Sequence, residues 1–255
     1  MINKITKGKQ DEDNLSERAQ SASVGAKKVD YRNVVVNKPW GYEYLMFENE
    51  HVAIWILHLK KGARTSMHCH PKKKTSLLVL EGQVTTASLC DEFTLQVLES
   101  LMIDAGAFHA TGTDFDTGSF IMEIETPPEK TDLVRLQDSY GRENKGYEGG
   151  EDIVSDLQKY EHHSFHDDVV AERAIIEKAI RRSRVLLHTR EDWESLKEEV
   201  SMNAYCIVSF LDTALHDENG NIVLDIGDIC EGEWLLSEYE KLHPSEDSFT
   251  VMTIH

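Results

Sequence analysis

The stretch GARTSMHCHPKKKTSLLVLEG, residues 62–82, decides the fold that this sequence predicts. It places His68 and His70 one residue apart, just before an apolar run that is typical of a strand. Side chains at positions i and i+2 of a strand point to the same face, so both imidazoles can enter one interior. A third histidine, His109, follows a glycine turn at Gly106 and can complete a set of three ligands.

Short apolar runs separated by turn residues continue on both sides of this stretch. They include HVAIWILHLK, QVTTASL, FTLQVLES and SFIMEIET. Strands at such close spacing predict an all-β sandwich or barrel. Changes in composition then divide the chain into four predicted parts. These are a flexible tail over residues 1–28, a β-barrel over 29–145, a polar linker with a helix over 146–183, and a small α+β domain over 184–255.

The helix in the predicted linker comes from the segment VVAERAIIEKAIRR, in which Ile175, Ile176, Ala179 and Ile180 would share one helical face. The α+β prediction for the last part comes from strand-like and helix-like segments that alternate there. SRVLLH and SFTVMTIH are typical of strands, and TREDWESLKEEV and EGEWLLSEYEKL are typical of helices. HDENGN, between two apolar runs, predicts a hairpin.

Charge and composition argue against several classes of partner. The 255 residues include 46 acidic and 27 basic side chains, which gives a net charge of −19. Such a chain repels nucleic acids and anionic membranes, so neither is predicted as a partner. No apolar run is long enough to span a bilayer, and the N-terminus lacks a hydrophobic signal segment, so a cytoplasmic location is predicted. The four scattered cysteines predict free thiols.

The spacing of glycines and histidines closely resembles the first motif of the cupin superfamily, G(x)5HxH(x)3-4E(x)6G. Gly62, His68, His70 and Gly82 stand at the matching distances, and Thr75 occupies the glutamate position. The resemblance implies a mainly β fold, a cupin jelly-roll barrel, followed in this chain by the helical linker and the α+β domain.

The second cupin motif, built around PxGxxH, is partly present. Gly106 and His109 match it, Asp104 stands at the proline position, and the trailing asparagine would fall on Thr113. Two further segments, NKPWGYEYL at residues 37–45 and DLVRLQDSYGR at 132–142, resemble the flanks of type II mannose-6-phosphate isomerases and related sugar-phosphate cupins. The resemblance covers about residues 37–142. It implies an isomerase of this type with a sugar-phosphate substrate, and a homodimer, since cupin barrels commonly pair through sheet edges.

The metal site predicted from the histidines contains His68, His70 and His109 and holds a divalent ion: zinc, iron, nickel or manganese. Thr75 offers only a neutral hydroxyl where a carboxylate would stand, so the site is predicted to be modified and still to bind metal. Two alternatives remain open on the same residues. One is a three-histidine iron dioxygenase, and the other is a non-catalytic, sugar-binding or regulatory cupin.

Basic residues near the histidines predict a phosphate site. The predicted substrate-binding residues are Arg64, Lys72, Lys73 and Lys74. The catalytic base is not assigned. Glu43 and Glu123 lie on predicted strands that can face inward, but both are interpreted as surface acids.

Overall fold

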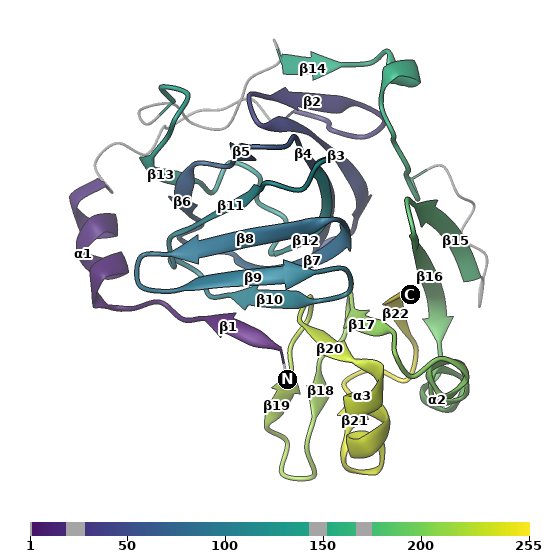
Figure 1. The fold of residues 1–255 in the computed structure, drawn as a ribbon. Coiled ribbons are helices and arrows are strands. Elements are labelled where there is room, and N and C mark those ends of the chain that lie inside the picture. Colours follow the sequence, from purple (N-terminus) through teal and green to yellow (C-terminus); the bar gives the residue numbers. More distant parts are fainter. Residues whose placement is uncertain (1, 19–28, 143–151, 167–174) are drawn as a thin grey trace.

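The computed structural model describes residues 2–18, 29–142, 152–166 and 175–255 (Figure 1). In this part of the chain two sheets, here called sheet A and sheet B, face each other and form a barrel. Sheet A contains, in spatial order, β1 (Asn3–Ile5), β10 (Ser100–Ile103), β7 (Lys74–Glu81), β12 (Ser119–Thr126), β4 (Ala53–Leu59), β3 (Gly41–Glu48), β2 (Val35–Lys38) and β14 (Ile153–Val154). Sheet B contains β13 (Val134–Gln137), β6 (Met67–Cys69), β11 (His109–Thr113), β8 (Gln83–Ser88) and β9 (Glu92–Gln96), and β5 (Ala63–Arg64) pairs with β11.

The last part of the chain forms a third sheet, sheet C, with two helices. In spatial order sheet C contains β15 (Ile175–Ile180), β16 (Ser183–Glu191), β22 (Phe249–Ile254), β17 (Ile207–Phe210) and β20 (Ile229–Glu231). The helices are α2 (Trp193–Met202) and α3 (Gly232–Glu238), with short 3-10 turns at Leu157–Lys159 and Tyr239–Lys241. A small sheet consists of β19 (Ile222–Leu224), β18 (Leu215–His216) and β21 (His243–Pro244), and the β18–β19 pair confirms the predicted hairpin. No described helix has the length and apolar character needed to cross a membrane.

Sheet A is buried on both faces, and this decides which side chains reach the barrel interior. Leu57 and Ile121 point inward and pack with Val84 of sheet B. Ile56 and Met122, each one residue away on the same strands, point outward. Strands covered on both faces read as nearly continuous apolar runs, which explains segments such as AIWILHL.

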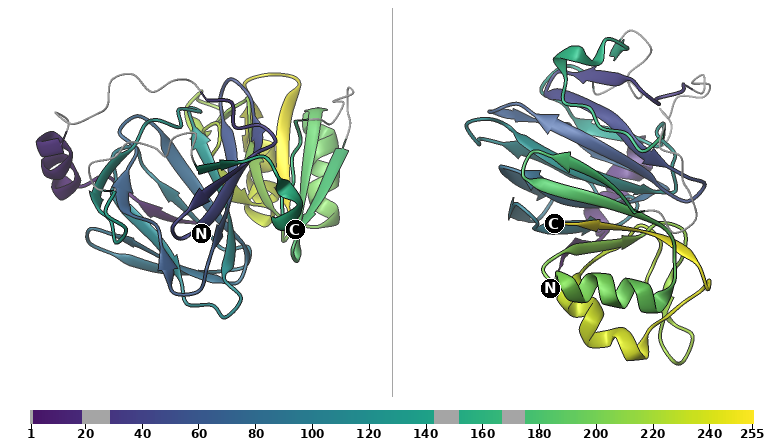
Figure 2. Two further views of the ribbon diagram at one scale, coloured as in Figure 1. Left: turned by 90° about the horizontal axis from the view of Figure 1, so that it is seen from above. Right: turned by 90° about the vertical axis from the view of Figure 1, so that its right-hand side faces the viewer.

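Sheet C covers the outer face of sheet A, and α2 and α3 cover the opposite face of sheet C (Figure 2). Leu187 and Met252 belong to the same apolar cluster as the outward residues of the barrel. On the other face, Leu196 and Leu235 of the helices pack with Val208 of β17. The predicted α+β domain therefore shares a hydrophobic core with the barrel.

The loop before β20 anchors sheet C to sheet A through polar contacts. Lys74 Nζ lies 2.8 Å from both Asp225 Oδ2 and Asp228 Oδ1, and Ser76 Oγ donates a hydrogen bond of 3.0 Å to the carbonyl of Gly227. Gly227 has a φ of +75°, a left-handed conformation that favours glycine.

The N-terminal segment differs from the flexible tail predicted for residues 1–28. β1 pairs in parallel with β10, and α1 (Lys9–Arg18) follows it. The buried carboxylate of Asp11 accepts hydrogen bonds of 2.8 Å from the backbone N–H groups of Gly8 and Phe108. Polar contacts of this kind leave no apolar signature in the sequence. Residues 19–28 lie outside the described part of the chain.

The helix predicted within the linker was wrong over residues 175–180, which form β15 and pair with β16 from Ile175↔His188 to Ile180↔Ser183. The alternation of a strand, with Ile180 buried and Ile175 exposed, replaces the expected helical face. Residues 169–174 of that prediction lie outside the described residues. The barrel also extends past its predicted end at residue 145, because β14 pairs with β2 and Phe165 joins the shared core.

Candidate metal centre

The three predicted histidines meet at one point of the barrel interior. His68 on β6 and His109 on β11 are directly opposite each other in an antiparallel pair, and His70 follows β6 on the same face. Their ring centroids are 4.5 Å (His68–His109), 5.0 Å (His68–His70) and 5.6 Å (His70–His109) apart. One ligand nitrogen from each imidazole lies within 4.8 Å of the other two, which is close enough for one ion to contact all three.

Backbone carbonyls fix the orientation of all three rings. The Nδ1 atoms of His68, His70 and His109 lie 2.7, 2.6 and 3.1 Å from the carbonyl oxygens of Ser66, Asp132 and Ala107. A carbonyl oxygen can only accept, so each Nδ1 carries the proton and each Nε2 offers a lone pair. His70 Nε2 is buried without a hydrogen-bond partner, as expected of an atom placed to bind a metal.

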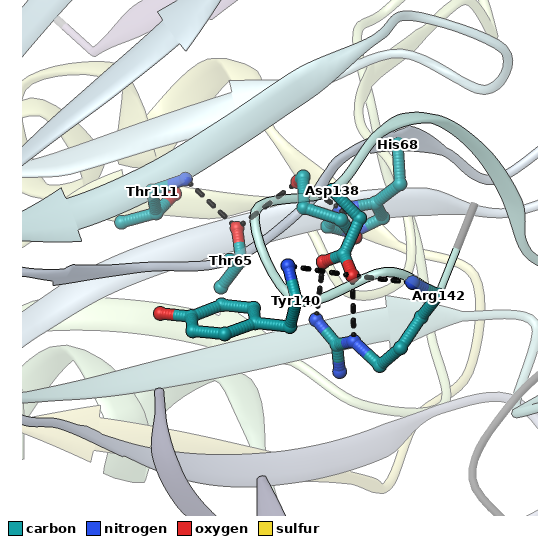
Figure 3. Close-up of polar contacts among 7 residues, drawn as sticks. Thr65, His68, Thr111, Asp138, Tyr140 and Arg142 are labelled. Atoms are coloured by element: carbon teal, nitrogen blue, oxygen red, sulfur yellow. Dashed lines mark hydrogen bonds and ion pairs between the residues drawn. The ribbon is translucent and has the colours of Figure 1, made fainter. Parts of the chain in front are cut away.

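A chain of hydrogen bonds supports His68 from the neighbouring strands (Figure 3). The backbone N–H of Thr111 donates to Thr65 Oγ1 at 3.0 Å, and that hydroxyl donates in turn to the Ser66 carbonyl at 3.3 Å. The same carbonyl accepts from His68, so the ring is tied to β11 as well as to its own strand.

Burial keeps these imidazoles in the form that binds metals. It holds the pKa of His68 and of His70 well below the usual range and lowers the pKa of His109 to about 4. All three are therefore neutral near pH 7, and a metal ion would not have to displace a proton from them. Neutral imidazoles with converging Nε2 atoms fit a divalent transition metal.

Carboxylates that the sequence interpretation placed on the surface lie inside the barrel. Glu43 and Glu123 are only 4% and 6% exposed, and both face the histidines, which corrects the interpretation as surface acids. Glu125, 1% exposed, lies two residues beyond Glu123 on the same face of β12. Ligand atoms of His70, Glu123 and Glu125 all lie within 4.8 Å of one another.

Buried lysines balance these acids. Lys73 Nζ lies 2.7 Å from Glu125 Oε1, Lys130 Nζ lies 3.0 Å from Glu43 Oε1, and Lys38 Nζ lies 3.6 Å from the same oxygen. Buried ion pairs of this kind are costly to break, because removal of one partner leaves an uncompensated charge.

The surroundings of Glu123 raise the pKa of its carboxyl group. Burial, followed by the negative charge of Glu125, raises the pKa of Glu123 to about 7. A carboxyl with such a pKa can take up and release a proton at neutral pH.

The structure separates the four predicted substrate-binding residues. Lys73 lines the histidine cavity, whereas Lys72 is exposed, with its Nζ 3.3 Å from Glu129. Lys74 faces sheet C, as described above, and Arg64 is exposed on β5 outside the cavity. Alternation explains the difference between Lys73 and Lys74 at the start of β7, because consecutive residues of a strand point to opposite faces.

Two arginines of the segment DLVRLQDSYGR, residues 132–142, reach the cavity that Arg64 does not. Arg135 and Arg142 both line it. Arg142 forms a two-point contact with Asp138, with Nε and one terminal nitrogen 3.0 and 2.7 Å from the two carboxylate oxygens (Figure 3). This contact closes the loop at residues 138–142 beside His68.

The sequence carried a signal for the residues that the prediction missed. Lys38 and Glu43 lie in the NKPWGYEYL segment. Glu123 and Glu125 are two and four residues after Ile121, an inward residue of β12, and so lie on the same face of that strand. A charged residue at every second position of an apolar strand indicates a polar face, which here is the inner one.

Among known proteins, only solved structures resemble this chain in the comparisons made. No protein-family model matches the chain, and no curated protein matches it. The TT1209 protein from Thermus thermophilus is 20% identical over 34% of this chain and 83% of its own, with a TM-score of 0.33. A sugar phosphate isomerase from a cupin superfamily, from Silicibacter pomeroyi, is 15% identical over 37% of this chain and 64% of its own, with a TM-score of 0.34.

A third solved structure is an uncharacterized conserved protein with a double-stranded β-helix domain from Klebsiella pneumoniae. It is 11% identical over 45% of this chain and all of its own, with a TM-score of 0.37. The solved structures that resemble this chain thus include cupin and double-stranded β-helix proteins. At these identities and TM-scores the resemblance does not extend to function.

Proposed function

We propose that this protein is a metal-dependent cupin enzyme that acts on a sugar phosphate, with an aldose–ketose isomerisation of the mannose-6-phosphate isomerase type as its reaction. The observation that carries the proposal is the convergence of three neutral imidazoles with buried carboxylates in one cavity. A divalent ion held by His68, His70 and His109 would polarise the substrate carbonyl.

The cavity favours an anionic substrate even though the chain is strongly acidic. Among the described residues that line it, five basic side chains face three glutamates, and one of the five, Arg142, is paired with Asp138. A local excess of positive charge can hold a phosphate against a net charge of −19.

Isomerisation needs one group that moves a proton between neighbouring carbons, and Glu123 is placed for this role. It faces the cavity, and one of its oxygens lies within 4.8 Å of a ligand atom of His70. In the proposed reaction its carboxylate takes the proton from C2 and returns it to C1, while the hydroxyl proton moves from O2 to O1. Atoms and charge balance without an oxidant. Lys73 and Lys130 remain against Glu125 and Glu43.

The first test is the metal content of the purified protein, measured by elemental mass spectrometry, for the wild type and the His68→Ala/His70→Ala variant. The expected result is about one divalent ion per chain in the wild type and a loss in the variant. A matched control, His51→Ala/His243→Ala, removes two histidines outside the cavity and should keep the metal. Full metal content in the first variant would refute the site.

The second test is the interconversion of mannose 6-phosphate and fructose 6-phosphate by the metal-loaded protein. Glu123→Gln should retain the metal and lose at least about 100-fold in kcat. Iron with oxygen consumption, or sugar-phosphate binding without turnover, would instead identify the dioxygenase or the binding module. Either result would overturn the isomerase proposal.

A further inference from the structure

Position 75, where the cupin pattern has a glutamate, faces a different carboxylate in this chain. Thr75 on β7 pairs directly with Glu125 on β12 in the antiparallel register of sheet A. Residues directly opposite each other in such a pair point to the same face, with Cβ atoms about 4.5–5.5 Å apart. The carboxylate of Glu125 therefore lies beside the place that a glutamate at position 75 would fill.

Two buried atoms with lone pairs near this position have no hydrogen-bond partner. Glu125 Oε2 and His70 Nε2 are both buried without a hydrogen-bond partner, and their residues are 1% and 7% exposed. An unsatisfied polar group at such depth is costly, and a cation between the two atoms would satisfy both. One ligand atom each of His70, Glu123 and Glu125 lie within 4.8 Å of one another, and His70 also belongs to the group of three histidines. An ion bound at His70 can therefore reach a carboxylate oxygen of Glu125.

We propose that Glu125 supplies the carboxylate ligand that position 75 lacks, binding the ion through Oε2 while Oε1 keeps its ion pair with Lys73. The inference rests on the proposed metal site and adds a fourth ligand from a strand outside both cupin motifs. It also gives a reason for Thr75, because a glutamate there would place two like charges directly opposite each other.

Zinc affinity, measured by competition with a chromophoric chelator, tests the assignment without any assay of activity. Glu125→Gln should weaken zinc binding by about 10- to 100-fold or more, since even the loss of hydrogen-bond partners behind metal ligands costs that much. Glu43→Gln, which removes another buried acid of the cavity, is the matched control and should bind zinc within about threefold of wild type.

The ammonium of Lys73 requires its own control, because Glu125→Gln leaves it without its counter-ion. The electroneutral variant Lys73→Met/Glu125→Gln separates the two explanations. If Glu125 is a ligand, zinc binding in this variant stays at least tenfold weaker than in Lys73→Met alone. If Glu125 only neutralises Lys73, the two variants bind zinc equally, and the proposal is overturned.

A positional swap provides the converse test. Thr75→Glu/Glu125→Thr returns the carboxylate to the cupin position, and we expect it to recover zinc affinity to within about tenfold of wild type. An affinity as weak as that of Glu125→Gln would contradict the assignment, as would a loss that follows Glu123→Gln and not Glu125→Gln. Failure of the metal site itself has a different signature, since the wild type would then bind no zinc.

Discussion

His188 on β16 should make the stability of the protein depend on pH. Its side chain is fully buried, its Nε2 lies 2.9 Å from Thr253 Oγ1, and its Nδ1 has no hydrogen-bond partner. Burial, with a smaller effect of the positive charge of His255, lowers the pKa of His188 from 6.5 to about 4. Glu191 Oε2 lies 3.9 Å from Nδ1 and is the acid that faces the ring from the same strand.

The sign follows from proton binding in the two states. Between pH 6.5 and about 4 the unfolded chain binds a proton at His188 and the folded chain does not, so stability falls as the pH decreases through this window. One pKa unit corresponds to about 1.4 kcal/mol. At pH 5, about 1.5 units below the unfolded value, the loss should be about 2 kcal/mol.

Urea unfolding at pH 8 and pH 5 measures this loss as the difference between wild type and His188→Gln, which cannot titrate and keeps a polar group near Thr253. The variant should lose about 2 kcal/mol less than wild type between the two pH values. His243→Gln, at an exposed position on β21, is the control and should follow the wild type. Equal losses in wild type and His188→Gln would contradict the lowering of the pKa of His188 by burial.

Three further predictions concern the core, the interdomain loop and the metal. Phe165→Ala should lower the free energy of unfolding by about 3 kcal/mol, because Phe165 is 3% exposed in the shared core; a loss under 1 kcal/mol in urea would contradict that packing. Gly227→Ala should cost about 2 kcal/mol or more, since its φ is +75° and a Cβ would lie 2.1 Å from Thr126 Oγ1; an unchanged melting temperature would refute this contact. Zinc at 100 times its Kd should add about 2.7 kcal/mol of stability to the wild type and nothing to His68→Ala/His70→Ala, and equal shifts in a thermal melt would place the ion elsewhere.

The histidine cluster could be predicted because its determinants are local. His68 and His70 share a strand face by their spacing alone, and a glycine turn before His109 allows the next ligand to join them. The antiparallel pairing of β6 with β11 then brings the rings together, as the motif implied.

The orientation of the acids in the cavity could not be predicted from local sequence, since it depends on a distant part of the chain. In SFIMEIET the usual rule directs Met122 and Ile124 inward and Glu123 outward. The structure does the reverse, because sheet C covers the outer face of β12 and provides an apolar environment there. Because the local sequence does not show that sheet C covers this face, the pattern of SFIMEIET predicts Glu123 on the surface.

Non-local pairing also explains the wrong helix at residues 175–180. The apolar spacing there is compatible with either period, and hydrogen bonds to β16 select the strand. The N-terminal segment is a similar case, because Asp11 is held by the backbone of Phe108, a residue almost a hundred positions away.

The strands β7 and β12 connect the candidate site to the last part of the chain through their alternating side chains. Lys73, before β7, and Glu125 on β12 face the histidines. Their immediate neighbours, Lys74 and Thr126, meet the loop around Gly227 on the opposite face. A displacement of that loop would therefore act on the same backbone that positions the proposed carboxylate ligand. For this reason sheet C is best understood as the outer support of the candidate site, rather than as a separate unit attached to a complete barrel.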